Sequence, residues 1–211
     1  MKIPTHKISD HAENGISIRM LTPDISVPDV TPLHRDDYYA FCFLSHGEFH
    51  MNVDFQRVTL QAGHIGCMLP GQIHQYISAR DTAGWIMFID SVHLSDDNLM
   101  AMRRFALNAH TLTIDERRTN ELSHIFPMLQ ERINSSQAKD FSWVITDIFT
   151  EVIDENDMTE RLTPRHRDVM LRFVQLVEQH IHESRQPSFY AGKLNITTGY
   201  LNEIVTATTG Q

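Results

Sequence analysis

Two short segments of the chain carry side chains that often bind metals or polar ligands. The segment 32–36 (PLHRD) holds His34 and Asp36, and the segment 70–74 (PGQIH) holds His74. Two imidazoles and one carboxylate on one side of an ion form the facial site that suits iron or manganese. The same side chains also act in proteins as polar groups hydrogen-bonded to backbone or water, or as direct contacts to an organic ligand. All three interpretations stay open, and we favour the two that need no metal.

Short strands are expected to position these side chains. Between residues 16 and 90 the chain runs through β-rich stretches, with Gly, Pro, Asn or Asp in most of the intervals: ISIRML, YAFCFLS, EFHMNVD, QRVTLQ, IGCML, HQYISA and GWIMFID. Many short strands at this spacing predict an antiparallel sandwich or barrel.

A barrel lined by aromatic and polar side chains can enclose one small ligand. Alternation along the strands sends Phe41 and Phe43 to one side, and Tyr76, Trp85 and Met87 are candidates for the inner side of neighbouring strands. We predict that a small-molecule effector contacts seven residues: His34, Asp36, Tyr38, Phe41, His74, Tyr76 and Trp85. The same aromatic residues equally predict a filled core, and the sequence does not separate the two.

Amphipathic helices follow the strands. Apolar residues recur every three or four positions in segments 116–133 and 141–153, and a shorter helix is expected over 96–107. The two longer helices either lie against the barrel or form a subunit interface, and we predict a homodimer through them. The polar segment 154–162 (DENDMTERL) is the expected linker to a second unit.

The last part of the chain predicts three helices joined by short turns. Thr163 is a natural N-cap before Pro164, and a long amphipathic helix follows. A short helix is expected over 189–194, a tight turn at 195–196, and a third helix capped by Thr197. A helix, a tight turn and a second helix form the helix-turn-helix arrangement.

The strand-rich region resembles a known superfamily. Residues 30–90, and above all the stretch LPGQIHQY, are similar to the paired motifs of the cupins. In metal-binding cupins these motifs supply three histidines and a glutamate. His34 and His74 match, whereas Asp36 replaces one histidine and no glutamate follows at the family's spacing. The resemblance implies a jelly-roll barrel, and with this incomplete ligand set we expect no cofactor.

The C-terminal segment resembles the first helix-turn-helix of the AraC family of transcription regulators. The residues in register with the family's motif are Ala191, Leu194, Ile196, Thr197, Tyr200, Leu201, Ile204, Val205 and Gly210. The resemblance implies binding to double-stranded operator DNA, with Thr198, Tyr200 and Asn202 at the start of the third helix as the expected contacts. Family members often carry Arg or Lys where this chain has Glu203 and Thr206. An acid at such a position repels phosphate.

The family's DNA-binding domain continues into a connecting helix and a second helix-turn-helix. This sequence ends at Gln211, where that helix is expected to begin. We therefore expect a truncated chain that binds an operator weakly, with the turn after Val205 as its least ordered part.

Composition restricts the class of protein. The net charge of −9 argues against a protein that coats nucleic acid, although the residues from Thr163 onward carry five basic against four acidic side chains. No apolar run is long enough to cross a bilayer and the N-terminus has no secretory pattern, which predicts a cytoplasmic protein without membrane contact. Cys42 and Cys67 are expected to be reduced and buried.

Together these features predict an α+β protein in three parts. Residues 1–110 form a cupin-like antiparallel sensor barrel, 111–160 a helical dimerisation and linker region, and 163–211 a partial all-α DNA-binding domain. The predicted function is ligand-responsive transcription regulation without catalysis. The alternative is a metal-dependent cupin enzyme, such as a dioxygenase or isomerase, that uses His34, Asp36 and His74.

Overall fold

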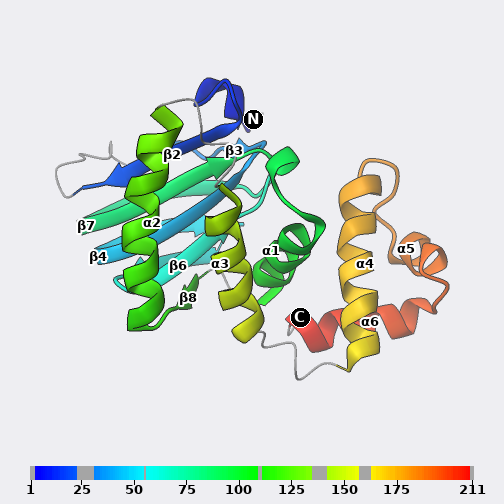
Figure 1. Ribbon diagram of the computed structural model, residues 1–211. Helices are drawn as coiled ribbons and strands as arrows, with labels where there is room; N and C mark the ends of the chain where they lie inside the picture. The colour runs from blue at the N-terminus through cyan, green and yellow to red at the C-terminus, as the bar shows by residue number, and fades with distance from the viewer. Residues whose placement is uncertain are drawn as a thin grey trace.

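The computed structural model describes residues 3–22, 31–54, 56–108, 111–134, 142–156 and 163–209 (Figure 1). The strands are β1 (Thr5–His6), β2 (Ile16–Leu21), β3 (Arg35–Asp36), β4 (Tyr39–Val53), β5 (Gln56–Gln61), β6 (His64–Met68), β7 (His74–Ile89) and β8 (Thr111–Thr113). The α-helices are α1 (Asp96–Asn108), α2 (Glu116–Asn134), α3 (Ser142–Glu155), α4 (Pro164–His180), α5 (Pro187–Lys193) and α6 (Thr198–Thr209). Short 3₁₀ turns cover Ile8–Asp10 and Ser91–His93.

A large antiparallel sheet forms the centre of the strand-rich part. Its order is β2-β7-β4-β6-β8, and β5 pairs with β4 beside this path. A second, two-stranded sheet pairs β1 with β3 in parallel. Within the described residues the pairing runs from β2 to β8 without closing, so the closed barrel expected from the sequence is wrong.

The strands β4 and β7 are also longer than the sequence predicted. The sequence predicted a turn near Gly47, between YAFCFLS and EFHMNVD, and another near Asp81, between HQYISA and GWIMFID. In the structure each pair of stretches forms one continuous strand, with shifts in the pairing register at these points. Gly47 (φ 75°) and Asp81 (φ 49°) adopt the left-handed conformation, which absorbs extra residues in a bulge. A Cβ on residue 47 would lie 2.3 Å from the Asp81 carbonyl oxygen, so only glycine fits there.

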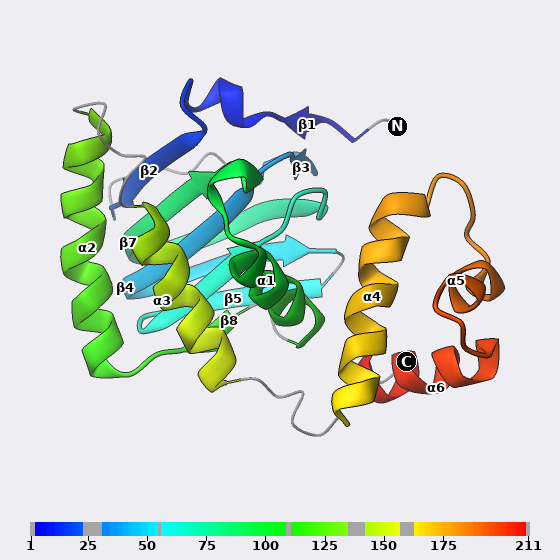
Figure 2. The ribbon, with the colours of Figure 1, turned by 45° about the vertical axis from the view of Figure 1, so that its right-hand side comes forward.

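Helices α1, α2 and α3 lie over one face of the sheet (Figures 1 and 2). Alternate side chains of β4 and β7 point toward them, as the two-residue period of a strand requires. The Phe41 ring meets Phe149 edge-on at 5.0 Å between centroids, and Phe43 and Trp85 stack on Phe126. Burying each such ring contributes about 2–3 kcal/mol, so this face is the main hydrophobic core.

Helices α4, α5 and α6 pack around a separate apolar cluster. The expected cap is confirmed, because the Thr163 hydroxyl accepts from the His166 amide ahead of a proline-led helix. The tight turn is also confirmed, with Asn195 at φ 55°, and the Thr197 hydroxyl accepts from the Tyr200 amide at 3.2 Å. Both views show these helices beside α1, which contacts α4 and α6.

The predicted helical boundaries hold to within two residues for α1 and α2. The predicted linker begins too early, because residues 154–155 belong to α3, and residues 157–162 of that stretch lie outside the described part of the chain. No helix formed by the described residues is long and apolar enough to cross a membrane.

Candidate ligand-binding site

The sheet face opposite the helices encloses a cavity of about 430 Å³. Residues from both halves of the long strands β4 and β7 line it, on either side of the shifts in their pairing register. Its apolar wall consists of Ala40, Cys42, Phe49, Met51, Val53, Val58, Leu60, Ile86 and Phe88, among others. Its polar groups are His6, His11, Arg19, Thr31, His34, Asp36, Tyr38, His74 and Tyr76.

The structure brings most of the predicted ligand residues to this cavity. His34, Asp36, Tyr38, His74 and Tyr76 all line it.

Phe41 and Trp85 are corrections to the prediction. Both are buried in the core between the sheet and the helices, on the opposite face. The predicted alternation of side chains between the two faces of the sheet is correct. The sequence could not tell which face carries the helices and which carries the cavity. The neighbours of Phe41 on β4, Ala40 and Cys42, line the cavity instead.

A backbone bridge holds His34 and His74 together. The amide of each donates to the carbonyl of the other, at 3.1 and 2.9 Å, and the two rings meet at 4.2 Å between centroids. The Nδ1 of His34 lies 2.9 Å from the Pro32 carbonyl, and the Nδ1 of His74 lies 3.1 Å from the Gln72 carbonyl. Because a carbonyl only accepts, both Nδ1 atoms donate, and each neutral ring offers a lone pair at Nε2. Burial lowers the pKa of His34, and the hydrogen bond to the Pro32 carbonyl opposes part of this effect.

Asp36 is the buried carboxylate of this group, with a relative exposure of 6%. Its Oδ2 lies 3.4 Å from Nε2 of His74, and its Oδ1 lies 3.6 Å from Nδ1 of His6. The register of β1 and β3 sets the second contact, since it pairs His6 with Asp36. The ligand atoms of His6, His34 and Asp36 lie within 4.8 Å of one another.

A second polar chain runs along the cavity from Arg19 through His11 to Tyr38. The Arg19 guanidinium donates to Nδ1 of His11 at 2.8 Å, so the neutral ring carries its proton on Nε2 and donates to the Tyr38 hydroxyl at 2.9 Å. Burial and then the Arg19 charge lower the pKa of His11. Burial raises the pKa of Tyr38, and the negative charge of Asp36 adds to the rise. Tyr38 is therefore a neutral hydroxyl at ordinary pH.

Sequence reasoning missed His6, His11 and Arg19. His6 and His11 stand outside every strand predicted from the sequence, and they reach the cavity because the N-terminal segment pairs with β3. The pattern gave no signal for this pairing, since two-residue strands are too short to show a period.

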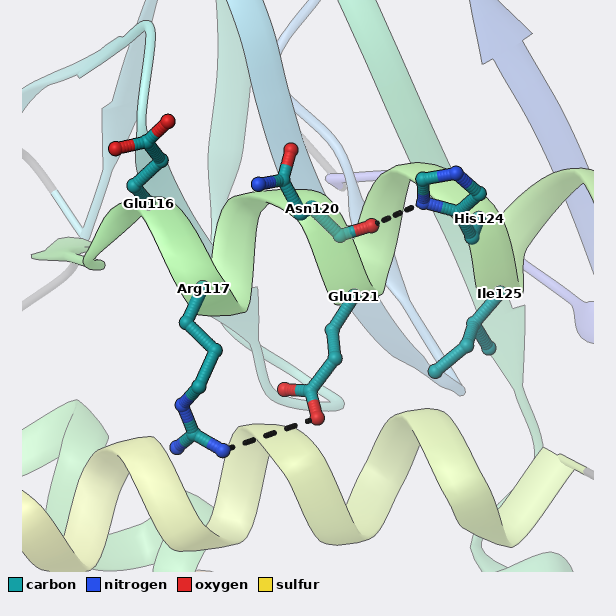
Figure 3. Close-up of a pocket in the computed structure, with 6 residues that line it drawn as sticks. All are labelled: Glu116, Arg117, Asn120, Glu121, His124 and Ile125. Carbon is teal, nitrogen blue, oxygen red and sulfur yellow. Dashed lines mark hydrogen bonds and ion pairs between the residues drawn. The ribbon is translucent and has the colours of Figure 1, made fainter.

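A second hollow lies on the exposed surface of α2, lined by Glu116, Arg117, Asn120, Glu121, His124 and Ile125 (Figure 3). Two contacts within the helix hold some of its polar groups. His124 Nδ1 donates to the Asn120 carbonyl at 2.6 Å, and Arg117 pairs with Glu121 at 4.0 Å. The cavity, with its buried carboxylate, is therefore the stronger candidate for a binding site.

The predicted DNA contacts lie at the start of α6. Asn202 is exposed, and Thr198 and Tyr200 are partly buried. The Tyr200 ring packs edge-on against His166, with Arg165 over its face. Asn202 is therefore the most available of the three side chains.

Comparison with known proteins gives one family match. The model of the AraC-like ligand binding domain matches residues 24–142. A search of curated protein sequences finds no match.

Several solved structures match the chain at low sequence identity. The AraC-like transcriptional activator CuxR is 14% identical with a TM-score of 0.44, and the match covers 90% of this chain and 66% of CuxR. ToxT from Vibrio cholerae, solved with an unsaturated fatty acid, is 12% identical with a TM-score of 0.42, covering 92% of this chain and 73% of ToxT. A cupin-2 protein from Shewanella frigidimarina is 18% identical with a TM-score of 0.30, covering 36% of this chain and 72% of its own. The chain thus spans just under two thirds of CuxR. The family match extends over more than half of the sequence, and the chain belongs to the family with an AraC-like ligand binding domain.

Proposed function

We propose that the protein is a ligand-responsive transcription regulator in which a small molecule binds the cavity and changes how a homodimer binds operator DNA. The division of labour follows the chain: residues 1–110 sense, 111–160 dimerise and relay, and 163–211 contact DNA. No step of this function requires catalysis. The observation that carries the proposal is the 430 Å³ cavity inside a domain of the AraC-like ligand-binding family.

The cavity lining indicates the kind of effector. A volume of about 430 Å³ is within the range of pockets for small organic molecules. One part of the wall is apolar, and the other holds Asp36, Tyr38 and the histidines. An effector with an apolar body and one polar group fits this lining.

Helix α1, the last helix of the sensing part, is the element that we propose to connect that part with α3 and with the C-terminal helices. It packs on β6 and α3 and also contacts α4 and α6. The Asn98 amide in α1 donates to Asp147 at 3.1 Å and to Thr150 at 2.9 Å, and Arg104 pairs with Asp154. Because α1 is fixed to α3, an effector that favours one position of β6 or α3 also favours one placement of α4 and α6.

The DNA-contacting element in this proposal is the pair α5 and α6. The turn at Asn195 sets α6 against α5, and the start of such a second helix is the part that reaches base edges. Asn202 supplies an amide that pairs with adenine in the major groove.

The homodimer in this proposal forms through α2 and α3. Both helices pack on the sheet, as expected if they lie against the strands. Met128 on α2 is nevertheless 45% exposed, which leaves an apolar side chain available to a partner. We expect Met128→Asp to shift a dimer to monomers in light scattering at micromolar concentration, since a charge in an apolar interface is costly. The matched control is Met100→Asp, which makes the same change at an exposed position of α1, outside α2 and α3. A wild-type chain that is monomeric under these conditions contradicts the dimer.

The function is tested by selecting duplexes from a random DNA pool with the whole chain. Asn202→Ala should weaken binding to the selected sequence by about 10- to 100-fold and relax its specificity, as the loss of one base contact does. Glu203→Lys should strengthen binding to any duplex by adding a phosphate contact. Glu183→Lys makes the same charge change outside α6 and is the control. Equal effects of the two lysine variants, or no effect of Asn202→Ala, would exclude α6 as the DNA-reading helix.

A further inference from the structure

We propose that His6, His34 and Asp36 bind a divalent transition-metal ion at the polar end of the cavity. This inference goes beyond the proposed function, because an organic effector fits the cavity in that proposal with or without an ion. It also departs from the sequence expectation of no metal. The new element is His6, which lies outside both sequence motifs and reaches the site through the pairing of β1 with β3.

The Asp36 carboxylate is the first reason. It is 6% exposed, and its Oδ1 is buried and accepts no hydrogen bond from the described residues. An ionised carboxylate buried without full compensation is costly, so a positive partner is expected at this point. The Oδ1 atom faces His6, and the Oδ2 atom faces His74.

The orientation of the histidines is the second reason. His34 and His74 each donate Nδ1–H to a backbone carbonyl, of Pro32 and Gln72 respectively. This second hydrogen bond fixes the tautomer and aims the Nε2 lone pair inward, as it does for histidines that bind metals. The Nε2 of His74 faces Oδ2 of Asp36 at 3.4 Å, which leaves Oδ1 as the carboxylate oxygen that faces His6.

The separations are the third reason. Zinc binds nitrogen and oxygen ligands at about 2.0–2.2 Å in a tetrahedron, which places neighbouring ligand atoms about 3.4 Å apart. The Oδ1 of Asp36 lies 3.6 Å from Nδ1 of His6, close to this separation. The ligand atoms of His6, His34 and Asp36 form one group within 4.8 Å.

The donor set selects the class of ion. Imidazole ligands suit zinc, nickel, copper and iron, whereas calcium and magnesium require oxygen ligands. No thiolate belongs to the group, since Cys42 lies in the apolar wall of the cavity. Zinc is therefore the appropriate probe.

The test is a titration of the whole chain, purified without a histidine tag and freed of metal with a chelator, with zinc chloride. Calorimetry should show one zinc ion per chain, and the melting temperature should rise with zinc concentration. His6→Ala and His34→Ala should each weaken zinc binding by at least about tenfold. Removing only the hydrogen-bond partner of a metal-binding histidine already lowers the metal affinity by about 10- to 100-fold, and removing the histidine itself lowers it at least as much. Asp36→Asn should weaken it similarly, and if that buried variant does not fold, the two histidine variants carry the test.

The control is His124→Ala, which removes a surface histidine of α2 and should leave the zinc affinity unchanged. This control is needed because the chain has 13 histidines. The inference is overturned if wild-type protein binds no zinc, or if His6→Ala and His34→Ala bind zinc as the wild type does. Zinc binding without any effect of an organic effector on DNA affinity would support the metal site and contradict the proposed function.

Discussion

At the scale of single residues, side chains that the sequence places far apart line one cavity. His34 and Asp36 follow one another closely, but His74 joins them through a backbone bridge and His6 through a parallel strand pair. The histidines at 34 and 74 could be predicted because a family motif marks them. His6 could not, because nothing local distinguishes it from the other histidines. Phe41 was assigned to the wrong face, since alternation gives two sides without saying which is the cavity.

Cys42 gives a prediction at this scale. Burial raises the pKa of its thiol to about 12. Because only the thiolate reacts, its deprotonated fraction at pH 8 is about a thousandfold below that of a free cysteine. Iodoacetamide should therefore modify Cys42 in a Cys67→Ala variant very slowly at pH 8 and faster as the pH rises toward 12. Mass spectrometry measures the rate, with the same variant in denaturant as the reference. Equal rates in the native and denatured chain would show that the cavity wall is open to water.

At the scale of elements, helices and caps were more predictable than the sheet. The periods of α1 and α2 are strong, and the Thr163 cap stands in its expected place. The sheet differs from the prediction at Gly47 and Asp81. The sequence was interpreted as having turns there, whereas the structure has a bulge inside two long paired strands. A glycine at positive φ is compatible with both structures, and only the partner strand decides between them.

Gly47→Ala tests the importance of this bulge. The new Cβ would lie 2.3 Å from the Asp81 oxygen at a φ of 75°, so we expect a loss of about 2–4 kcal/mol of unfolding free energy. Gly71→Ala is the matched control, because Gly71 has a φ of 84° but no atom within 4 Å of the added Cβ. It should cost only about 1 kcal/mol. Urea denaturation measures both, and equal losses would mean that the close approach to Asp81 is unimportant.

Arg118 joins α2 to α3. Its buried guanidinium donates to Glu151 at 2.5 Å and to Glu155 at 3.3 Å, and also pairs with Glu121. The glutamates are partly exposed, so screening limits the cost of Arg118→Ala to about 1–3 kcal/mol.

The neighbouring Arg117 provides the comparison. Its pairing with Glu121 spans 4.0 Å and its side chain is 64% exposed, so Arg117→Ala should change stability by less than about 0.5 kcal/mol. Thermal or urea unfolding of the two variants decides whether the buried pair holds α2 to α3. Similar values for both would contradict that role.

At the scale of the whole molecule, the arrangement joins a cavity to a group of three C-terminal helices through α1. The sequence predicted the order of these parts, because motif resemblances mark both ends of the chain. It could not predict the contact of α1 with α4 and α6, since contacts between separate units leave no periodic pattern in the sequence. The proposed regulation depends on this contact and on an effector in the cavity.

The most direct measurement is a thermal-shift screen of small organic molecules against the wild-type chain and Ala40→Leu. Ala40 lines the cavity, so a larger side chain there fills part of it, whereas Ala62→Leu makes the same change at an exposed position. A compound at 100 times its dissociation constant stabilises the folded chain by about 2.7 kcal/mol, or about 5–10 °C at this size. We expect this shift for the wild type and Ala62→Leu and less than half of it for Ala40→Leu. Compounds that stabilise Ala40→Leu as strongly as the wild type would contradict binding in the cavity.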